Sequence, residues 1–569
     1  MRRCFLILTL LFATIFAYSQ IIDNQLIEEL SRRSDDEKIE VIVIMKVRYD
    51  RDVLTRKAAS CATRAERRAL VVNELKAFAK ESQKDLMNFV GGNAKTLWMS
   101  NSLCFSATKS QILEIANRND VAIIGLDLKE QLIPEMDNEY ESQVINSKEQ
   151  NDYIAVHLTQ VNATEVWELG YTGAGVIIAV IDSGVNYNHL DLADHMWNGG
   201  EAFPHHGYDI VNDDDDPMDD KGHGSHCAGI ACGDGNGGRK TGVAPDAILM
   251  AVKTVDADGF GGAINIAAGM EWAVEHGCDV ISMSLGMVNT NVVNKELLRR
   301  TCVAVNDAGV PAAVCTGNEG HMQYYSPIPN NVRVPGSCPP PYLDPDQLGN
   351  PGELSCVISV GAVDGSTDEA AYFTSQGPVT WQDTEFGDYP YEPGIGLIRP
   401  DVSAPGVEIE SLYWEWNNAY WSQSGTSQAT PIVAGIMALM LQKNPEITPA
   451  EICRILEESS VKLTPQKSNL TGMGRVDALA AIEMLDHWDV EENQAKQFSV
   501  YPNPAKDYIY INNSSVEMLF IASQIEIMDI NGQLMEINVK KGKIDVSHLP
   551  NGIYLLKIGD YSQKLIINR

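Results

Sequence analysis

Three short segments place polar residues of catalytic type at the ends of apolar elements. Asp182 follows the continuous apolar run 176–181, which is typical of a buried parallel strand. His223 stands between two glycines and opens a stretch with helical spacing, and Ser427 follows a tight turn in front of the apolar helix expected over 429–442. Open α/β sheets bind ligands at the carboxyl ends of their strands, so we expect these three side chains to meet there.

Together, these residue types can activate a hydroxyl group. A serine hydroxyl is a weak nucleophile at neutral pH, and it needs a base that is itself oriented by a third group. Ser427, His223 and Asp182 fit these three roles. Taken singly, each motif is also explained as a turn, a loop or a helix cap, but their combination in one order favours catalysis.

The motifs 179–184 (AVIDSG), 222–229 (GHGSHCAG) and 424–431 (SGTSQATP) resemble those of the subtilisin-like, or subtilase, serine proteases, which carry Asp, His and Ser in this order. The resemblance implies an α/β fold with a parallel sheet flanked by helices. It also implies a secreted serine endopeptidase, made as a zymogen, that hydrolyses peptide bonds through an acyl-enzyme. The alternative is a catalytically inactive binding protein on a protease scaffold, displayed at the cell surface.

The resemblance also assigns roles around the three residues. Asn318, in the motif 317–320 (GNEG), and the backbone N–H of Ser427 would stabilise the oxyanion. Cys227 would lie under His223 as a free thiol. Two residues differ from the commoner Thr and Met of the family without removing a catalytic group, and they are Ser225 and Gln428.

A protein or peptide substrate is expected to bind as an extended strand between two walls of a cleft. Glu319 would lie near the mouth of the specificity pocket, where its carboxylate suits a basic residue before the scissile bond. The resemblance implies that the walls are formed by Ser284, Leu285 and Gly286 on one side, and by Thr316 and Gly317 on the other.

Oxygen-rich loops indicate calcium, which prefers carboxylate and carbonyl ligands. Asp191 lies in a segment that resembles a ligand segment of the family, and Asp234 and Asn236 lie in a glycine-rich loop that follows the helix of the catalytic His. The acidic run 213–220 suits a second ion or a solvated loop equally well. The pair His205–His206 has no partner at zinc-ligand spacing, so no zinc is expected.

The N-terminal third has the pattern of targeting and maturation segments. Residues 1–19 resemble a signal peptide, with two arginines, an apolar stretch too short for the alternative of a membrane anchor, and a small-residue cleavage site. Residues 20–145 resemble the inhibitory propeptide of subtilases in position and in a β-α-β-β-α-β pattern, with an unrelated N-terminal domain as the alternative. The polar stretch 137–152 is the expected maturation linker. The chain would therefore carry its own inhibitor as an α+β domain.

The catalytic domain is expected over 153–487 and a separate module over 495–569, with the polar stretch 489–497 between them. The YPNP opening of the module, its NGIYLLKI strand and its terminal KLIIN resemble the C-terminal sorting domain of type IX secretion. This resemblance implies a small β-sandwich, recognition by the type IX machinery, and export through the periplasm to the cell surface or the medium. A carbohydrate- or protein-binding β-sandwich is the alternative.

Composition narrows the classes of partner. The formal net charge of −34, from 43 basic and 77 acidic residues, argues against nucleic acid, because phosphate binding needs clustered Lys and Arg. No apolar run after the first 19 residues predicts a transmembrane segment. Export permits disulfides, and Cys338 and Cys356, which bracket a Pro-rich loop, are the best candidate pair among 11 cysteines. The residues of the insertion 320–354, which contains this loop, do not indicate a role for it.

Overall fold

The computed structural model describes residues 21–133, 144–146, and 153–569 apart from positions 289, 345, 351, 393–394, 496–498, 502, 513–524, 530–532, 536, 541–542 and 559–560. The predicted signal peptide and most of the predicted maturation linker lie outside the described residues. The chain forms two compact units, Met1–Leu343 with Gly352–Ile482, and Asp344–Pro351 with Glu483–Arg569.

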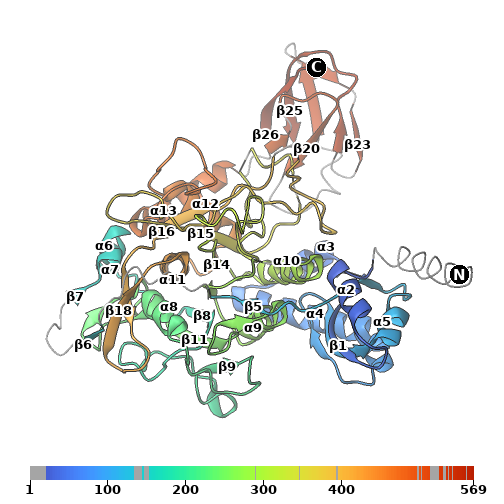
Figure 1. Ribbon diagram of the computed structural model, residues 1–569. Helices are drawn as coiled ribbons and strands as arrows, with labels where there is room; N and C mark the ends of the chain where they lie inside the picture. Colours follow the sequence, from blue (N-terminus) through green and yellow to red (C-terminus); the bar gives the residue numbers. More distant parts are fainter. Residues whose placement is uncertain are drawn as a thin grey trace, which may run out of the picture. The chain divides into compact units, whose positions relative to one another are not determined.

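A seven-stranded, all-parallel sheet forms the centre of the larger unit (Figure 1). Its residues are almost all buried, as expected for a parallel sheet that is covered on both faces. This confirms the predicted fold class. In spatial order the strands are β16 (Val402–Pro405), β15 (Val357–Val363), β14 (Ala312–Cys315), β13 (Val280–Met283), β8 (Ile177–Asp182), β11 (Ile248–Lys253) and β9 (Gly207–Asp209).

Helices pack on the strands of this sheet. α11 (Thr426–Lys443) contacts β13 to β16, and it is buried almost along its whole length because its sequence is apolar all round. α8 (His223–Cys232) packs against α11 and β8, while α9 (Ala263–Glu275) packs against β8, β11 and α10 (Val292–Asp307). α12 (Pro449–Ser459) starts at a capping box, in which Thr448 and Glu451 satisfy each other's backbone N–H groups.

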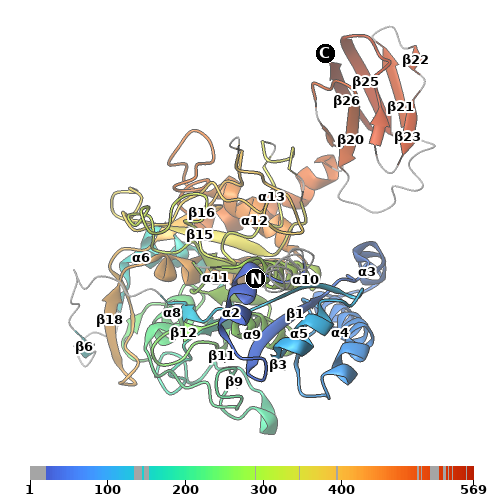
Figure 2. The ribbon, with the colours of Figure 1, turned by 45° about the vertical axis from the view of Figure 1, so that its right-hand side comes forward.

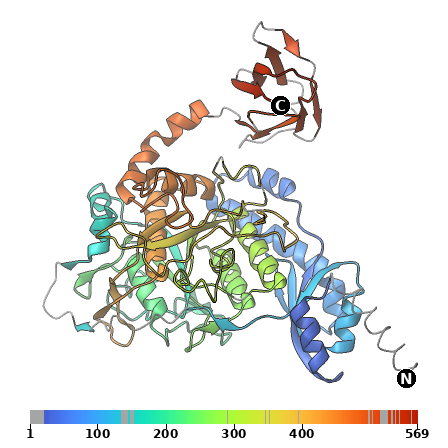
Figure 3. The same cartoon turned by 45° about the horizontal axis from the view of Figure 1, so that its top comes forward.

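An α+β segment precedes this core in the sequence. The antiparallel strands β2 (Lys95–Leu97), β3 (Ser102–Thr108), β1 (Lys38–Met45) and β4 (Val121–Gly125) lie in this order, and two additional helices accompany the predicted β-α-β-β-α-β pattern. The segment packs on α9 and α10, as Figure 2 and Figure 3 show for the blue part of the chain. Its helices are α2 (Asn24–Arg32), α3 (Arg51–Ala58), α4 (Arg64–Phe89) and α5 (Lys109–Ile115).

The smaller unit contains two antiparallel four-stranded sheets with a shared apolar core, which is the predicted β-sandwich. The stretch 489–495, predicted as a polar linker, is instead helical, because α13 (Ala478–Ala495) continues through it. The sheets are β19 (Ser499–Tyr501), β20 (Tyr508–Asn512), β24 (Lys543–Asp545) and β23 (Asn538–Lys540), and β22 (Leu534–Met535), β21 (Ile525–Asp529), β25 (Gly552–Ile558) and β26 (Tyr561–Ile567).

All ten cysteines in the described part of the chain are free. The predicted Cys338–Cys356 disulfide is therefore wrong for this structure. The thiol of Cys302, on α10, interacts with the thiols of both Cys338 and Cys356. The positions of these two cysteines on either side of the loop were therefore not enough to predict a disulfide between them. Burial raises the pKa of Cys302 and of Cys338, which keeps both groups protonated.

Candidate active site

Asp182 and His223 form a close pair at the end of the central strand. Asp182 is the last residue of β8 and is fully buried, and His223 is the first residue of α8. The distance between His223 Nδ1 and Asp182 Oδ1 is 2.7 Å. Burial of the imidazole opposes its protonation, but the Asp182 carboxylate outweighs this effect and raises the pKa of His223 well above its ordinary value. The pair can therefore take up and hold a proton.

Ser427 lies in the first turn of α11, beside this pair. Its Oγ donates to the carbonyl oxygen of Ser284 at 3.1 Å. The thiol of Cys227 donates to the Ser427 carbonyl at 3.4 Å and lies 3.9 Å from His223 Nδ1, so the two catalytic candidates share a neighbour. Cys227 is a buried free thiol below the imidazole, as expected from the resemblance.

Asn318 is oriented by the start of the same helix. Its Oδ1 accepts hydrogen bonds from the backbone N–H and the hydroxyl of Thr426, both at 3.0 Å. These bonds fix which end of the amide carries the donor. Gly317, which precedes it, has a φ of 107°, and a Cβ there would collide with Glu319 and with the side chain of Arg333. The bend that positions Asn318 therefore requires glycine.

A segment of the chain itself lies between β12 (Phe260–Gly261) and the predicted wall at Ser284–Gly286. β5 (Glu130–Gln131) pairs antiparallel with β12, and Leu132 N–H donates to the Gly259 carbonyl at 2.9 Å. On the other side, Gly286 N–H donates to the Leu132 carbonyl at 3.3 Å. This is the strand-addition geometry that was expected for a substrate.

Glu319 does not lie open at a pocket mouth. It is 7% exposed, and its Oε1 accepts from Arg333 Nη2 at 2.6 Å and from Nε at 3.0 Å. Its Oε2 accepts from the Ser375 hydroxyl at 3.1 Å. The prediction that this carboxylate receives a basic substrate residue is corrected, because Arg333 already neutralises it. Sequence reasoning missed Arg333, which lies in the insertion to which no role was given.

The predicted calcium ligands come from two segments that touch, since the Asp234 N–H donates to the Asp191 carbonyl at 3.2 Å. The Asp191 carboxylate accepts the Gly237 N–H and, at 2.8 Å, the Tyr420 hydroxyl. Burial raises the pKa of Asp191 to about 6. Each of its two oxygens accepts one hydrogen bond, and Asp191 is not part of the cluster that Asp194 and Asp234 form.

Asp234 and Asn236 lie instead beside a residue that was not predicted, Asp194. Asn236 Nδ2 donates to Asp194 Oδ2 at 3.0 Å and to Asp234 Oδ2 at 2.5 Å, so one amide bridges two carboxylates. Burial and the Asp194 charge raise the pKa of Asp234. His195 Nδ1 lies 2.8 Å from Asp194 Oδ1, which completes the cluster. These two carboxylates are a better fit to a divalent cation than Asp191 is.

Comparison with known proteins supports the assignment of the fold. Residues 173–474 match the subtilase family, and residues 499–568 match the secretion system C-terminal sorting domain. The chain is 33% identical over 336 residues to serine protease AprX of Bacillus subtilis (strain 168), which covers 54% of this chain and 66% of AprX. It is 32% identical over 326 residues to subtilisin E of the same strain, covering 57% and 70%, and 31% identical over 326 residues to subtilisin of Bacillus pumilus, covering 57% and 98%.

The parallel sheet and these matches define a serine endopeptidase. The chain belongs to the subtilase family. The sorting-domain match identifies it as a type IX secretion substrate destined for the cell surface or the medium. None of the described helices has both the length and the apolarity that crossing a membrane requires.

Proposed function

We propose that Ser427, His223 and Asp182 hydrolyse peptide bonds through an acyl-enzyme, with Asn318 as an oxyanion donor. The observation that carries the proposal is the 2.7 Å contact between His223 Nδ1 and Asp182, beside a serine at a helix start. For attack, the Ser427 hydroxyl must turn from the Ser284 carbonyl to His223 Nε2, a change typical of sites that align only with substrate bound.

Each side chain then has one task. Ser427 Oγ attacks the peptide carbonyl, and its proton passes to His223, whose charged form Asp182 stabilises. The developing oxyanion accepts from Asn318 Nδ2 and from the Ser427 backbone N–H at the start of α11. His223 returns the proton to the leaving amine, and water releases the acyl group by the same route in reverse.

We propose that residues 20–145 are the inhibitory propeptide of a zymogen, removed by the enzyme itself. The strand-added segment 130–133 supports this, since it would exclude substrate from the same position. Basic side chains of residues 48–76 also pair with acidic side chains of the following domain. These pairs are Arg48–Glu385, Arg51–Asp307, Arg64–Asp279, Arg67–Glu446, Arg68–Asp279 and Lys76–Glu275.

We propose further that calcium stabilises the folded enzyme, held by Asp194 and Asp234. The support is the amide of Asn236 between the two carboxylates, where a positive group is favoured. Turning that amide over would present its oxygen as a third ligand, of the kind that calcium prefers.

A fluorophosphonate label tests the catalytic proposal against the alternative of an inactive binding scaffold. The matured enzyme should be labelled at Ser427, and Ser427→Ala should abolish both the label and peptide hydrolysis. Asp182→Asn and His223→Ala should lose most activity, with little further loss in the double variant, because the three groups act as one unit. Folded, matured protein that takes up no label would favour the inactive scaffold.

A further inference from the structure

The insertion 320–354 returns along the two walls of the cleft. Val334 pairs with Met287 through two backbone hydrogen bonds, of 2.8 and 2.9 Å, next to the Ser284–Gly286 wall. One residue earlier, Arg333 N–H donates to the Thr316 carbonyl of the other wall at 2.8 Å. The backbone at residues 333–334 is therefore hydrogen-bonded to both walls, and these bonds fix the position of the Arg333 Cα atom.

The guanidinium of Arg333 donates hydrogen bonds both to Glu319 and to the strand 130–133 in the cleft. Its Nε and Nη2 are bound to Glu319, which compensates the charge of a side chain that is only 5% exposed. The remaining nitrogen, Nη1, donates to the Gly286 carbonyl at 2.8 Å, to the Leu132 carbonyl at 2.9 Å and to the Gln131 carbonyl at 3.2 Å.

The last two acceptors belong to the strand that pairs with Phe260–Gly261. They are main-chain carbonyls, which every peptide offers whatever its side chains. When residues 130–133 leave, Nη1 retains the Gly286 carbonyl from the wall and its donors face the position of the departed carbonyls. Glu319 holds the planar fork of N–H donors of the Arg333 guanidinium in place. A substrate strand in the same register would therefore meet donors that are already oriented.

We propose that Arg333 is a substrate-positioning residue that binds the main-chain carbonyls of the residues on the N-terminal side of the scissile bond. This inference rests on the proposed function. It assigns a role to the insertion, and it makes Glu319 the partner that holds Arg333 rather than a receptor for basic side chains. Because the contact exists before and during the reaction, its loss should appear mainly in KM.

Two substrates with the same leaving group test the inference. One is a peptide with four residues before the scissile bond, and the other is an acetylated single-residue ester that lacks the carbonyls in question. Arg333→Met should lower the long-to-short ratio of kcat/KM at least tenfold, mostly through KM of the long peptide. Arg333→Lys, which keeps the charge beside Glu319 but not the fork, should lower the ratio less, and it replaces the Met variant if that variant does not fold.

Arg475→Met is the matched control. Arg475 also binds one carboxylate, Asp368, and one carbonyl, that of Gln160, but it contacts neither wall. Its ratio should equal that of the parent enzyme. If Arg333→Met has the same long-to-short ratio of kcat/KM as the parent, and its Ser427 is still labelled by fluorophosphonate, the proposed role of Arg333 is wrong but the proposed function stands. A parent enzyme that takes no label and turns over neither substrate would overturn the proposed function and this inference together.

Discussion

The side chain of Asn318 is fixed at its carbonyl end by Thr426, so its effect on catalysis can be separated from its effect on binding. Asn318→Ala should lower kcat by about 10²–10³ with little change in KM, because the oxyanion exists only in the transition state; this range is already established for loss of such a donor in subtilisin itself. Steady-state kinetics on one peptide provide the measurement. A rise in KM with unchanged kcat would contradict the oxyanion role.

Some contacts of the individual site residues could be predicted from the sequence, and others could not. Asp182 and His223 each sit in a short motif at the end of an element, so local pattern was enough to expect their contact. The partner of Glu319 was not predictable, because Arg333 comes from an irregular insertion whose path no periodicity reveals. The hydrogen bond of Asp191 was not predictable for a similar reason, since Tyr420 reaches it from a strand 229 residues away.

At the scale of elements, helices and strands with strong periodicity were predicted well. The helix expected over 429–442 lies within α11, which spans Thr426–Lys443, and α8 begins at His223 as expected. The stretch 489–497 was predicted as a linker from its polarity alone. Polarity does not exclude a helix, and good helix formers such as Glu and Gln continue α13 to Ala495.

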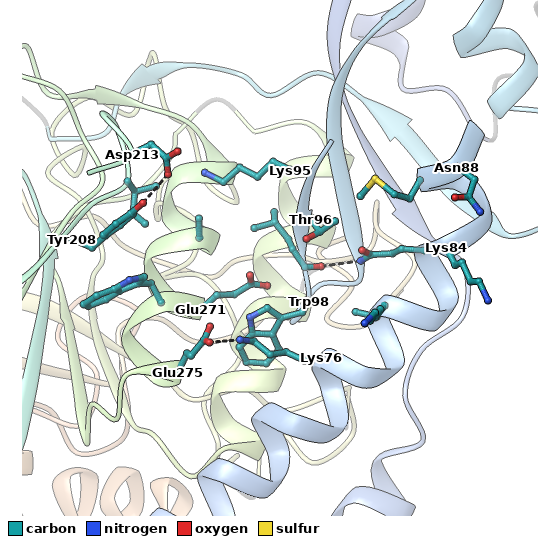
Figure 4. Close-up of a pocket in the computed structure, with 18 residues that line it drawn as sticks. Lys76, Lys84, Asn88, Lys95, Thr96, Trp98, Tyr208, Asp213, Glu271 and Glu275 are labelled. Atoms are coloured by element: carbon teal, nitrogen blue, oxygen red, sulfur yellow. Dashed lines mark hydrogen bonds and ion pairs between the residues drawn. The ribbon is translucent and has the colours of Figure 1, made fainter. Parts of the chain in front are cut away.

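The contact between α9 and the predicted propeptide should respond to pH. Glu271, on α9, is buried against a cavity of 640 Å³ between α4 and α9, and its carboxylate accepts the Met99 N–H at 2.6 Å. Figure 4 shows it among Lys76, Lys95 and Glu275. Burial raises the pKa of Glu271 from 4.5 to about 8. Glu296, which faces Arg48 of the same segment, has its pKa raised to about 7 by burial and by Glu385.

Release of the proposed propeptide would expose Glu271 to water and return its pKa toward 4.5, so that association would take up a proton. The complex is then tightest below about pH 4.5 and weakens as the pH rises toward 8. Active enzyme should appear faster from the processed complex at pH 8 than at pH 5. Glu271→Gln, which stays neutral and still accepts from Met99, should reduce this difference, with Glu296 supplying the remainder. Slower release at the higher pH would contradict the sign.

The loop between α8 and β11 gives a second prediction at this scale. An ion bound only by the folded protein stabilises it by mass action, so a chelator should lower Tm. Asp194→Asn with Asp234→Asn should remove this response. Asp191→Asn should lower Tm through the loss of its own hydrogen bonds but should keep the response to chelator. A Tm that is unchanged in chelator would exclude the calcium site.

At the scale of the whole molecule, the two units divide export from chemistry. The candidate catalytic residues all lie in the larger unit, and the sorting-domain match, 499–568, lies in the smaller one. α13 continues to Ala495, and Ala481 and Ile482 within it are buried, so a truncation should keep this helix intact. A chain that ends at Ala495 should therefore fold and hydrolyse peptides at the parent rate.

In a host with type IX secretion, this truncated chain should accumulate as active protease in the periplasm, whereas the full chain should reach the surface or the medium. The reason is that the tail is the part of the chain that matches a sorting signal. Fractionation with a peptide assay of each compartment gives the measurement. As a control, the tail 496–569 fused behind a reporter with a signal peptide should carry the reporter out. Normal secretion of the truncated enzyme, with loss of binding to a glycan or protein, would instead identify the tail as a binding module.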